Sequence, residues 1–266
     1  MKFDSNLAWR QASATIVVNR DVLLPLAGVF FLLPRLAASL LLPEPPVVSG
    51  SDPVAMATAM EHFYSQLLPW LIPMALFQGV GTLAILTLFT DRTRPTVAQA
   101  IKLGARGLLP YLGAQILFAL GMVLIGGGLV MLAAFSGSNG LSGTVLLAVI
   151  VAAVVAYVHL VLVAPVIAVE RLYHPIAALR RSWQLTRGNA LRVLGFLVLL
   201  SVVAMVAMLA ALSVTSAVAA LLGGSEAVRV TKAVVSGVLS GTIMLVMTSV
   251  LAAVHRQLAD PTAPLL

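Results

Sequence analysis

Six long apolar runs constrain this chain more than any other feature of its sequence. They cover about residues 22–42, 66–90, 108–135, 144–168, 193–222 and 230–254. A transmembrane helix needs about 20 mostly apolar residues to cross roughly 30 Å of hydrocarbon. Only 9% of the residues are charged and 61% are hydrophobic, which is far from the composition of a soluble domain. The sequence therefore predicts an all-α, polytopic membrane bundle of six transmembrane helices, in one integral membrane domain over residues 1–266.

Lysines and arginines are distributed unevenly between the two sets of connections. Thirteen of the sixteen lie in the N-terminal segment, residues 91–107, residues 169–192 and the C-terminal tail. The remaining three, Arg35, Arg229 and Lys232, lie in the other set of loops or in the predicted spans next to them. Basic residues of short loops stay in the cytoplasm, so we expect both termini to be cytoplasmic. The first 21 residues include Asp4 and Asp21, unlike the start of a signal peptide, and we expect the first run to be retained as a helix.

The cytoplasmic segments contain two or three candidate interfacial amphipathic helices, at about 4–19, 95–106 and 175–187. The last two begin at Pro95 and Pro175, and proline is common at the first position of a helix. In the third segment the apolar residues recur at helical spacing and the polar residues share another side: Ile176, Leu179 and Trp183 against Arg180, Arg181, Gln184 and Arg187. We expect these helices to lie in the membrane interface, with the apolar face in lipid.

An internal repeat is also indicated. Arg20, Arg106 and Arg187 each stand just before a long apolar run, at separations of 86 and 81 residues. This spacing predicts three units, each formed by an interfacial helix, a span, an outer loop and a second span.

The basic stretch RSWQLTRGNALR, residues 181–192, has two interpretations. In the first, its charges set topology only, and the helix stops where Gly188 or Asn189 adopts a left-handed cap. In the second, the cations bind anionic lipid headgroups and the amphipathic tryptophan ring lies at headgroup depth. The candidate headgroup residues are Arg180, Arg181, Arg187, Trp183, Lys102 and Arg106. We expect no nucleic-acid binding, because no nucleic-acid-binding fold accompanies the patch.

A few polar side chains fall inside the predicted spans: Arg35, His159, Tyr157, Gln78 and Gln115. A charge within the membrane is costly, and it marks a functional candidate by default. Arg35 follows Pro34 and can extend toward the outer surface, with Glu61 as a candidate partner. The histidine and the glutamines either hydrogen-bond between helices or contact a proton or a substrate. The segment SGVLSG, residues 236–241, predicts close helix packing, within the chain or across a homo-oligomer.

One longer stretch resembles a known family. APVIAVERLYHPIAALRRSWQLTRGN, residues 164–189, is similar to the glycerophosphoryl diester phosphodiesterase membrane-domain family and to the related YciC-type inner-membrane proteins of bacteria. VHRQL, residues 254–258, is similar to that family's usual ending, with His255 where an aromatic residue is commoner. The resemblance implies a free-standing membrane domain in the bacterial cytoplasmic (inner) membrane. The histidine and paired acidic residues of the fused phosphodiesterase have no match here, so the activity does not follow.

The sequence contains no recognisable catalytic motif, and it has no cysteine. We therefore expect no enzymatic activity, no metal and no cofactor. Three function classes fit what remains. The first is a non-enzymatic protein that binds, organises or moves lipid. The second is a small-solute or ion transporter, for which Pro69, Pro73 and Pro165 hint at discontinuous helices. The third is an accessory subunit of a larger membrane complex.

Overall fold

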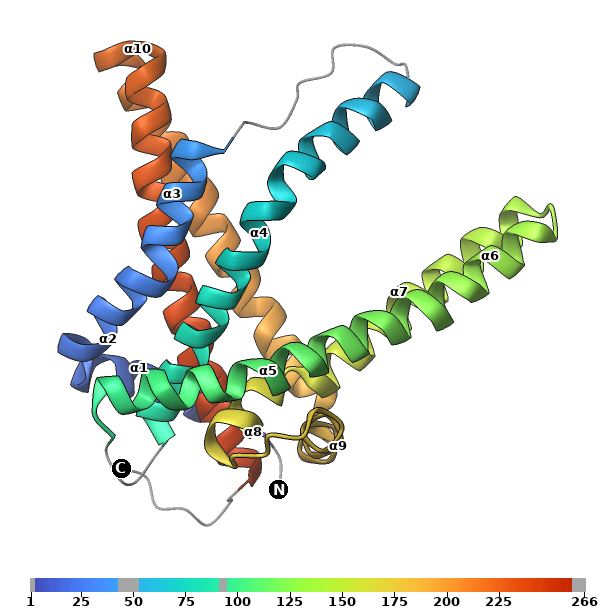
Figure 1. Ribbon diagram of the computed structural model, residues 1–266, viewed down its shortest axis with the longest axis horizontal. Helices are drawn as coiled ribbons and strands as arrows, with labels where there is room; N and C mark the ends of the chain where they lie inside the picture. The colour runs from blue at the N-terminus through green and yellow to red at the C-terminus, as the bar shows by residue number, and fades with distance from the viewer. Residues whose placement is uncertain (1–2, 43–52, 91–94, 260–266) are drawn as a thin grey trace. The chain divides into compact units, whose positions relative to one another are not determined.

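A computed structural model describes residues 3–42, 53–90 and 95–259, and every regular element in those ranges is a helix (Figure 1). Six stretches are long and apolar enough to span a membrane: Arg20–Leu41, Val54–Phe89, Val97–Phe135, Asn139–Val169, Ala190–Leu221 and Glu226–Ala259. The prediction of an all-α, multi-pass membrane protein is thereby confirmed. The helices extend beyond the predicted spans, most of all α4 (Pro53–Thr90), which runs unbroken through Pro69 and Pro73. Those two prolines therefore do not mark a discontinuous helix.

The chain divides into two compact units. Unit 1 contains Met1–Val18, Thr82–Leu200 and Thr248–Leu266, and unit 2 contains Asn19–Gly81 and Ser201–Met247. Both α4 and the long helix α10 (Ala190–Ala259) contribute residues to each unit. Within α10, Gly224 adopts a φ of +70°, which a residue with a side chain rarely adopts, and the helix bends there into two arms.

Unit 1 is built on a long helical hairpin. One side is formed by α5 (Val97–Gly121), the π-helical η2 (Met122–Gly127) and α6 (Gly128–Phe135), and the other by α7 (Asn139–Leu160). Figure 1 shows α6 and α7 side by side. The adjoining η2 also approaches α7 closely: Gly126 leaves no room for a side chain, since a Cβ there would lie 2.8 Å from Val149 Cγ1. Two short helices, α8 (Val163–Val169) and α9 (Pro175–Thr186), pack against α5, and α9 also packs against α7.

Unit 2 contains the first span, formed by α2 (Arg20–Ala27), the π-helical η1 (Gly28–Leu32) and α3 (Leu33–Leu41). Pro34 has no N–H to give to the carbonyl of Phe30, which accounts for the wider turn just before it. Gly81 packs on Phe30 so closely that a Cβ would lie 2.4 Å from the Phe30 Cβ. Gly237 and Gly241 face Leu32, so the predicted small-residue face makes a contact within the chain.

The three predicted interfacial segments differ in how they join their spans. α1 (Ser5–Val18) is separated from α2 by Asn19, and α9 is separated from α10 by a turn around Gly188. Residues 97–106, in contrast, form the first turns of α5 and continue into the span without a break. A helix break therefore separates the interfacial segment from its span at two of the three positions, and the threefold repeat stays a prediction. Residues 91–94 of this loop lie outside the described residues.

Candidate functional site: the cationic surface of unit 1

The helix α9 packs into unit 1 through a face of small residues. Its buried residues are Ala178, Ser182, Leu185 and Thr186. The predicted apolar face lies elsewhere, because Ile176 is 54% exposed and Trp183 is 45% exposed. Three faces therefore share this short helix: a small-residue face against the protein, an exposed apolar face and a cationic face. Exposed apolar residues beside exposed cations are what an interfacial helix requires.

The end of α7 is fastened to α9 through His159. α7 ends at Leu160, and α8 begins only at Val163 with Pro165 in its first turn, which leaves carbonyl groups without intrahelical partners. The Ser182 hydroxyl donates to the His159 carbonyl at 2.7 Å. The ring Nδ1 of His159 lies 2.8 Å from the Thr186 hydroxyl, and the ring stacks on Trp183 at a centroid distance of 4.1 Å. His159 is therefore used for packing between helices, one of the two roles predicted for it.

Glu170 joins three elements of unit 1. Arg181 of α9 donates from Nε to the Glu170 carboxylate at 2.8 Å, and His255 of α10 lies 3.0 Å from the other oxygen. Burial by itself would raise the pKa of Glu170, but the hydrogen bonds with His255 and Arg181 outweigh it and hold that pKa below its ordinary value. The next residue, Arg171, adopts a φ of +54° at the turn that follows α8. Arg181 is thus paired with Glu170, and its role as a headgroup residue stays a prediction.

The RGN turn holds the N-terminal segment in place. Gly188 adopts a φ of +85° and ends α9, as one of the two predicted caps. Asn189 directly precedes α10, and its carbonyl accepts from the backbone of Arg192 and Val193 in the first turn of that helix. Its side chain also accepts from the backbone N–H of Phe3 at 2.9 Å. This motif is therefore a junction of three chain segments as well as a helix stop.

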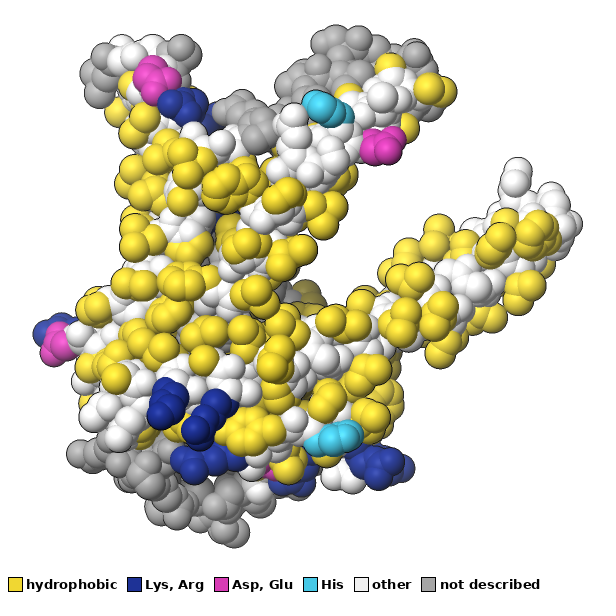
Figure 2. Space-filling view, viewed as in Figure 1, with side chains coloured by type: hydrophobic (Ala, Val, Ile, Leu, Met, Phe, Trp, Pro, Cys, Tyr) yellow, Lys and Arg dark blue, Asp and Glu magenta, His cyan; other side chains and the backbone are white. Residues whose placement is uncertain are grey.

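Four of the predicted headgroup cations are exposed and form no ion pair in the described part of the chain. They are Lys102 and Arg106 on α5, and Arg180 and Arg187 at α9. The described residues of unit 1 include nine lysines and arginines but only two acids, Asp4 and Glu170. Figure 2 shows dark-blue side chains near the start of α5 and beside α9, and none on the tip of the α6–α7 hairpin. We call these four residues the exposed cations of unit 1.

The polar residues predicted inside the spans are not brought together. Arg35 is exposed on α3 in unit 2, and among the described residues it forms no ion pair with Glu61. Tyr157 is 59% exposed on α7. Gln115 donates to the hydroxyl of Tyr111 on its own helix at 3.0 Å. Gln78 is half-buried in α4 of unit 2. The described residues contain no cluster of three metal-ligating side chains.

The sequence reasoning missed the pairing of Glu170 with His255. A signal for it was available, since Glu170 is the sole acidic residue between Asp91 and Glu226. A lone acid next to an arginine-rich helix in a membrane protein has a strong reason to be paired.

Comparison with known proteins identifies a family and no function. Residues 12–259 match a family model described as "Domain of unknown function (DUF7847)". The match covers most of the chain, which therefore belongs to this family. No curated protein matches the chain. No solved structure matches it either.

Proposed function

We propose that this member of the DUF7847 family is a non-enzymatic protein of the bacterial cytoplasmic (inner) membrane that binds, organises or moves lipid. The observation that carries the proposal is the unbalanced charge of the exposed cations of unit 1. Arg180 and Arg187 have no acidic partner in the described part of the chain, and the exposed ring of Trp183 lies between them in sequence. The ligand class is an anionic phospholipid headgroup.

The chemistry of these side chains suits a phosphate at the membrane surface. An arginine guanidinium donates several hydrogen bonds in a planar array that matches phosphate oxygens. A tryptophan ring prefers the depth where headgroups meet hydrocarbon. Each lysine or arginine near an anionic membrane surface contributes about 1 kcal/mol of attraction at physiological salt. Because Arg181 is held by Glu170, Arg180 on α9 and Arg187 directly after it are the arginines left for lipid.

The membrane orientation that goes with this proposal has both termini in the cytoplasm. It rests on the excess of lysine and arginine in the predicted cytoplasmic segments. The resemblance of residues 164–189 to the glycerophosphoryl diester phosphodiesterase membrane-domain family supports a bacterial inner-membrane location and suggests no reaction. The lipids bound at α9 would then belong to the cytoplasmic leaflet.

The test is a double substitution, Arg180→Gln with Arg187→Gln, in nanodiscs that mix phosphatidylglycerol with phosphatidylcholine. Native mass spectrometry would count the retained phosphatidylglycerol molecules. At about 1 kcal/mol for each cation, we expect roughly 30-fold weaker selectivity for phosphatidylglycerol in the double variant. The charge-preserving pair Arg180→Lys with Arg187→Lys is the matched control and should keep most of the selectivity.

Two results would count against the proposal. Unchanged selectivity in the glutamine pair would mean that these charges set topology alone. A protein that co-purifies at fixed stoichiometry, with no lipid enriched, would favour the accessory-subunit class. Transport of a small solute would instead appear as a flux that is lost on changing His159 or Arg35 while lipid binding stays intact.

A further inference from the structure

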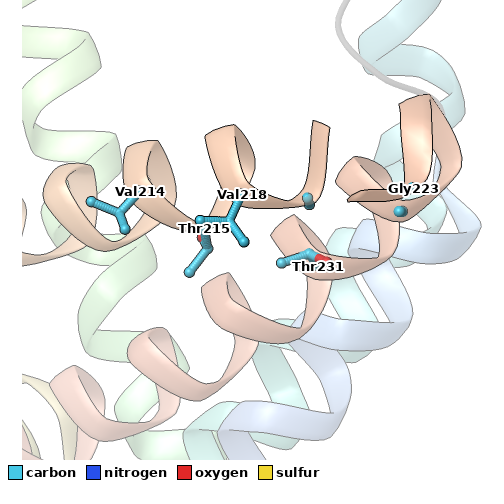
Figure 3. Close-up of a pocket in the computed structure, with 7 residues that line it drawn as sticks. Val214, Thr215, Val218, Gly223 and Thr231 are labelled. Atoms are coloured by element: carbon cyan, nitrogen blue, oxygen red, sulfur yellow. The ribbon is translucent and has the colours of Figure 1, made fainter. Parts of the chain in front are cut away.

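Unit 2 contains a cleft between the two arms of α10. Its volume is about 460 Å³, within the 300–1,000 Å³ typical of ligand pockets. Figure 3 shows Val214, Thr215 and Val218 along one arm, Thr231 across from them on the other arm, and Gly223 at the bend. Two of its lining residues, Val214 and Val218, are 64% and 49% exposed. It lies outside the surface discussed above, since its residues all belong to unit 2.

The cleft exists because small residues surround a tight bend. A Cβ at Gly223 would lie 2.4 Å from the Cβ of Ala227, so the arms touch at the bend. Further along, Ala219 and Ala227 line the cleft with single methyl groups. Larger side chains at these positions would fill the space between the arms.

The lining is suited to hydrocarbon. None of its described residues is charged. Its polar groups are the hydroxyls of Thr215 and Thr231, and Thr215 already donates to the Ala211 carbonyl at 2.6 Å. A charged solute would lose its hydration here without gaining partners. An apolar chain would lose nothing and would remove the exposed valines from contact with water or loosely packed lipid.

One cation near the cleft is suited to a phosphate. Between Arg192 and Arg256 the charged residues are Glu226, Arg229 and Lys232. Arg229 is paired with Glu226 at 2.8 Å. Lys232 directly follows the lining residue Thr231, is exposed, and has no ion pair in the described ranges. An apolar groove followed by an unbalanced cation matches a molecule with an apolar chain and an anionic head.

We propose that this cleft binds one acyl chain of a phospholipid whose phosphate is held by Lys232. Both arms belong to stretches that are able to span a membrane, so acyl chains are the apolar ligands present at high concentration around them. The site is separate from the exposed cations of unit 1, and it would bind lipid even if those cations served topology alone.

The test uses phosphatidylglycerol with a photoreactive diazirine in one acyl chain, incorporated into nanodiscs with the full-length protein. After illumination, peptide mass spectrometry locates the cross-links. We expect them to concentrate at residues 214–219 and 227–231. Val218→Trp, which fills the cleft, should reduce them about tenfold, equivalent to roughly 1.4 kcal/mol of binding free energy. Val206→Trp is the matched control, because Val206 is 57% exposed on the same arm outside the lining.

Two further variants test the headgroup contact and keep the experiment decisive. Lys232→Gln should reduce cross-linking of phosphatidylglycerol more than that of phosphatidylcholine, and Arg35→Gln, an exposed cation of the same unit, should leave both unchanged. If Val218→Trp did not fold, Val214→Phe would replace it. Cross-links spread evenly over both arms, or equally frequent in Val218→Trp and Val206→Trp, would overturn the proposal. The pair Arg180→Gln and Arg187→Gln should leave this labelling intact, so failure at one site is distinguishable from failure at the other.

Discussion

Replacing Glu170 by glutamine should destabilise unit 1 by about 2–3 kcal/mol, because it keeps the shape of the side chain but removes its charge. Hydrogen bonds to charged groups contribute about 1.5–3 kcal/mol each. The His255 side chain is only 4% exposed and would lose its partner in a buried position. The Arg181 side chain is 37% exposed and could hydrogen-bond to water instead. Loss of its bond to Glu170 should therefore cost less free energy than loss of a fully buried bond.

The assay is thermal unfolding in nanodiscs, followed by tryptophan fluorescence. Trp183 stacks on His159 in the helix that also contains Arg181, so its emission reports on this region. For a chain of this size each kcal/mol shifts Tm by about 2–4 °C, so the expected loss is roughly 4–12 °C. Glu61→Gln is the matched control, since Glu61 is exposed and has no ion pair with Arg35 among the described residues. It should stay within about 0.5 kcal/mol of the wild type.

The pH dependence of Tm, compared between the wild type and Glu170→Gln, tests whether the charge of Glu170 stabilises the fold. The folded-state pKa of Glu170 is lowered from its ordinary value of 4.5, so the unfolded chain binds the proton more readily. The stabilisation is therefore fully present above pH 4.5 and is lost as pH falls through the lower, folded-state pKa. The difference in Tm between the wild type and Glu170→Gln should shrink on acidification below that value. Equal Tm values at neutral pH, or a difference that grows in acid, would refute the role assigned to this carboxylate.

Two packing contacts give further predictions, both measured by the same unfolding assay. Gly81→Ala should cost about 1–3 kcal/mol, because its new methyl group would lie 2.4 Å from the Phe30 Cβ. Gly28→Ala, in a helical turn with nothing within 4 Å of the new group, should be neutral or stabilise by up to about 1 kcal/mol. Equal effects of the two alanines would contradict the close approach at Gly81. Ser182→Ala should cost about 1–2 kcal/mol, because the His159 carbonyl would lose its closest donor. No change in Tm would show that this bond does not hold α9 in place.

The six spans could be predicted from hydrophobicity, but the helix ends could not. The length of an apolar run reflects the thickness of the hydrocarbon layer that the segment crosses. A helix can continue beyond that layer, because its backbone can go on forming hydrogen bonds in the adjoining polar residues. The second span illustrates the difference. Its apolar run begins near residue 66, whereas α4 begins at Pro53 and includes the polar stretch around Glu61.

Glycine has two different uses near the starts of the third and fifth spans. The sequence around Thr96 correctly predicts a helix start, and Thr96 forms a reciprocal capping arrangement with Gln99. The helix continues to Gly121, and Gly104 and Gly107 are buried within it. A Cβ at Gly107 would lie 3.1 Å from Ile167 Cγ2, so this glycine permits close packing. Gly188, in contrast, ends a helix with a positive φ, and only the folded neighbours distinguish the two uses.

The exposed cations of the candidate site were predicted, but the partner of Arg181 was not. An amphipathic period assigns residues to the sides of a helix and does not specify what lies opposite each side. Glu170 and His255 are 85 positions apart in the sequence, and their contact depends on how the chain folds. Charge pairs of this kind therefore become visible only in the three-dimensional structure.

The use of the two acids among the described residues of unit 1, Asp4 and Glu170, explains why its described surface is so basic. The Asp4 carboxylate accepts from the backbone of Asn6 and Leu7, at 2.9 and 3.1 Å, and so caps the start of α1. Glu170 is held between Arg181 and His255. Both of these acids thus stabilise helix ends or junctions, and in the described part of unit 1 neither is left to neutralise the exposed cations. If topology were the only requirement, additional acids on this surface would be tolerated, because acidic residues contribute little to orientation. Introducing glutamates at the exposed positions Gln184 and Ala105 should therefore preserve topology and weaken phosphatidylglycerol selectivity, whereas unchanged selectivity would confine these cations to a topological role.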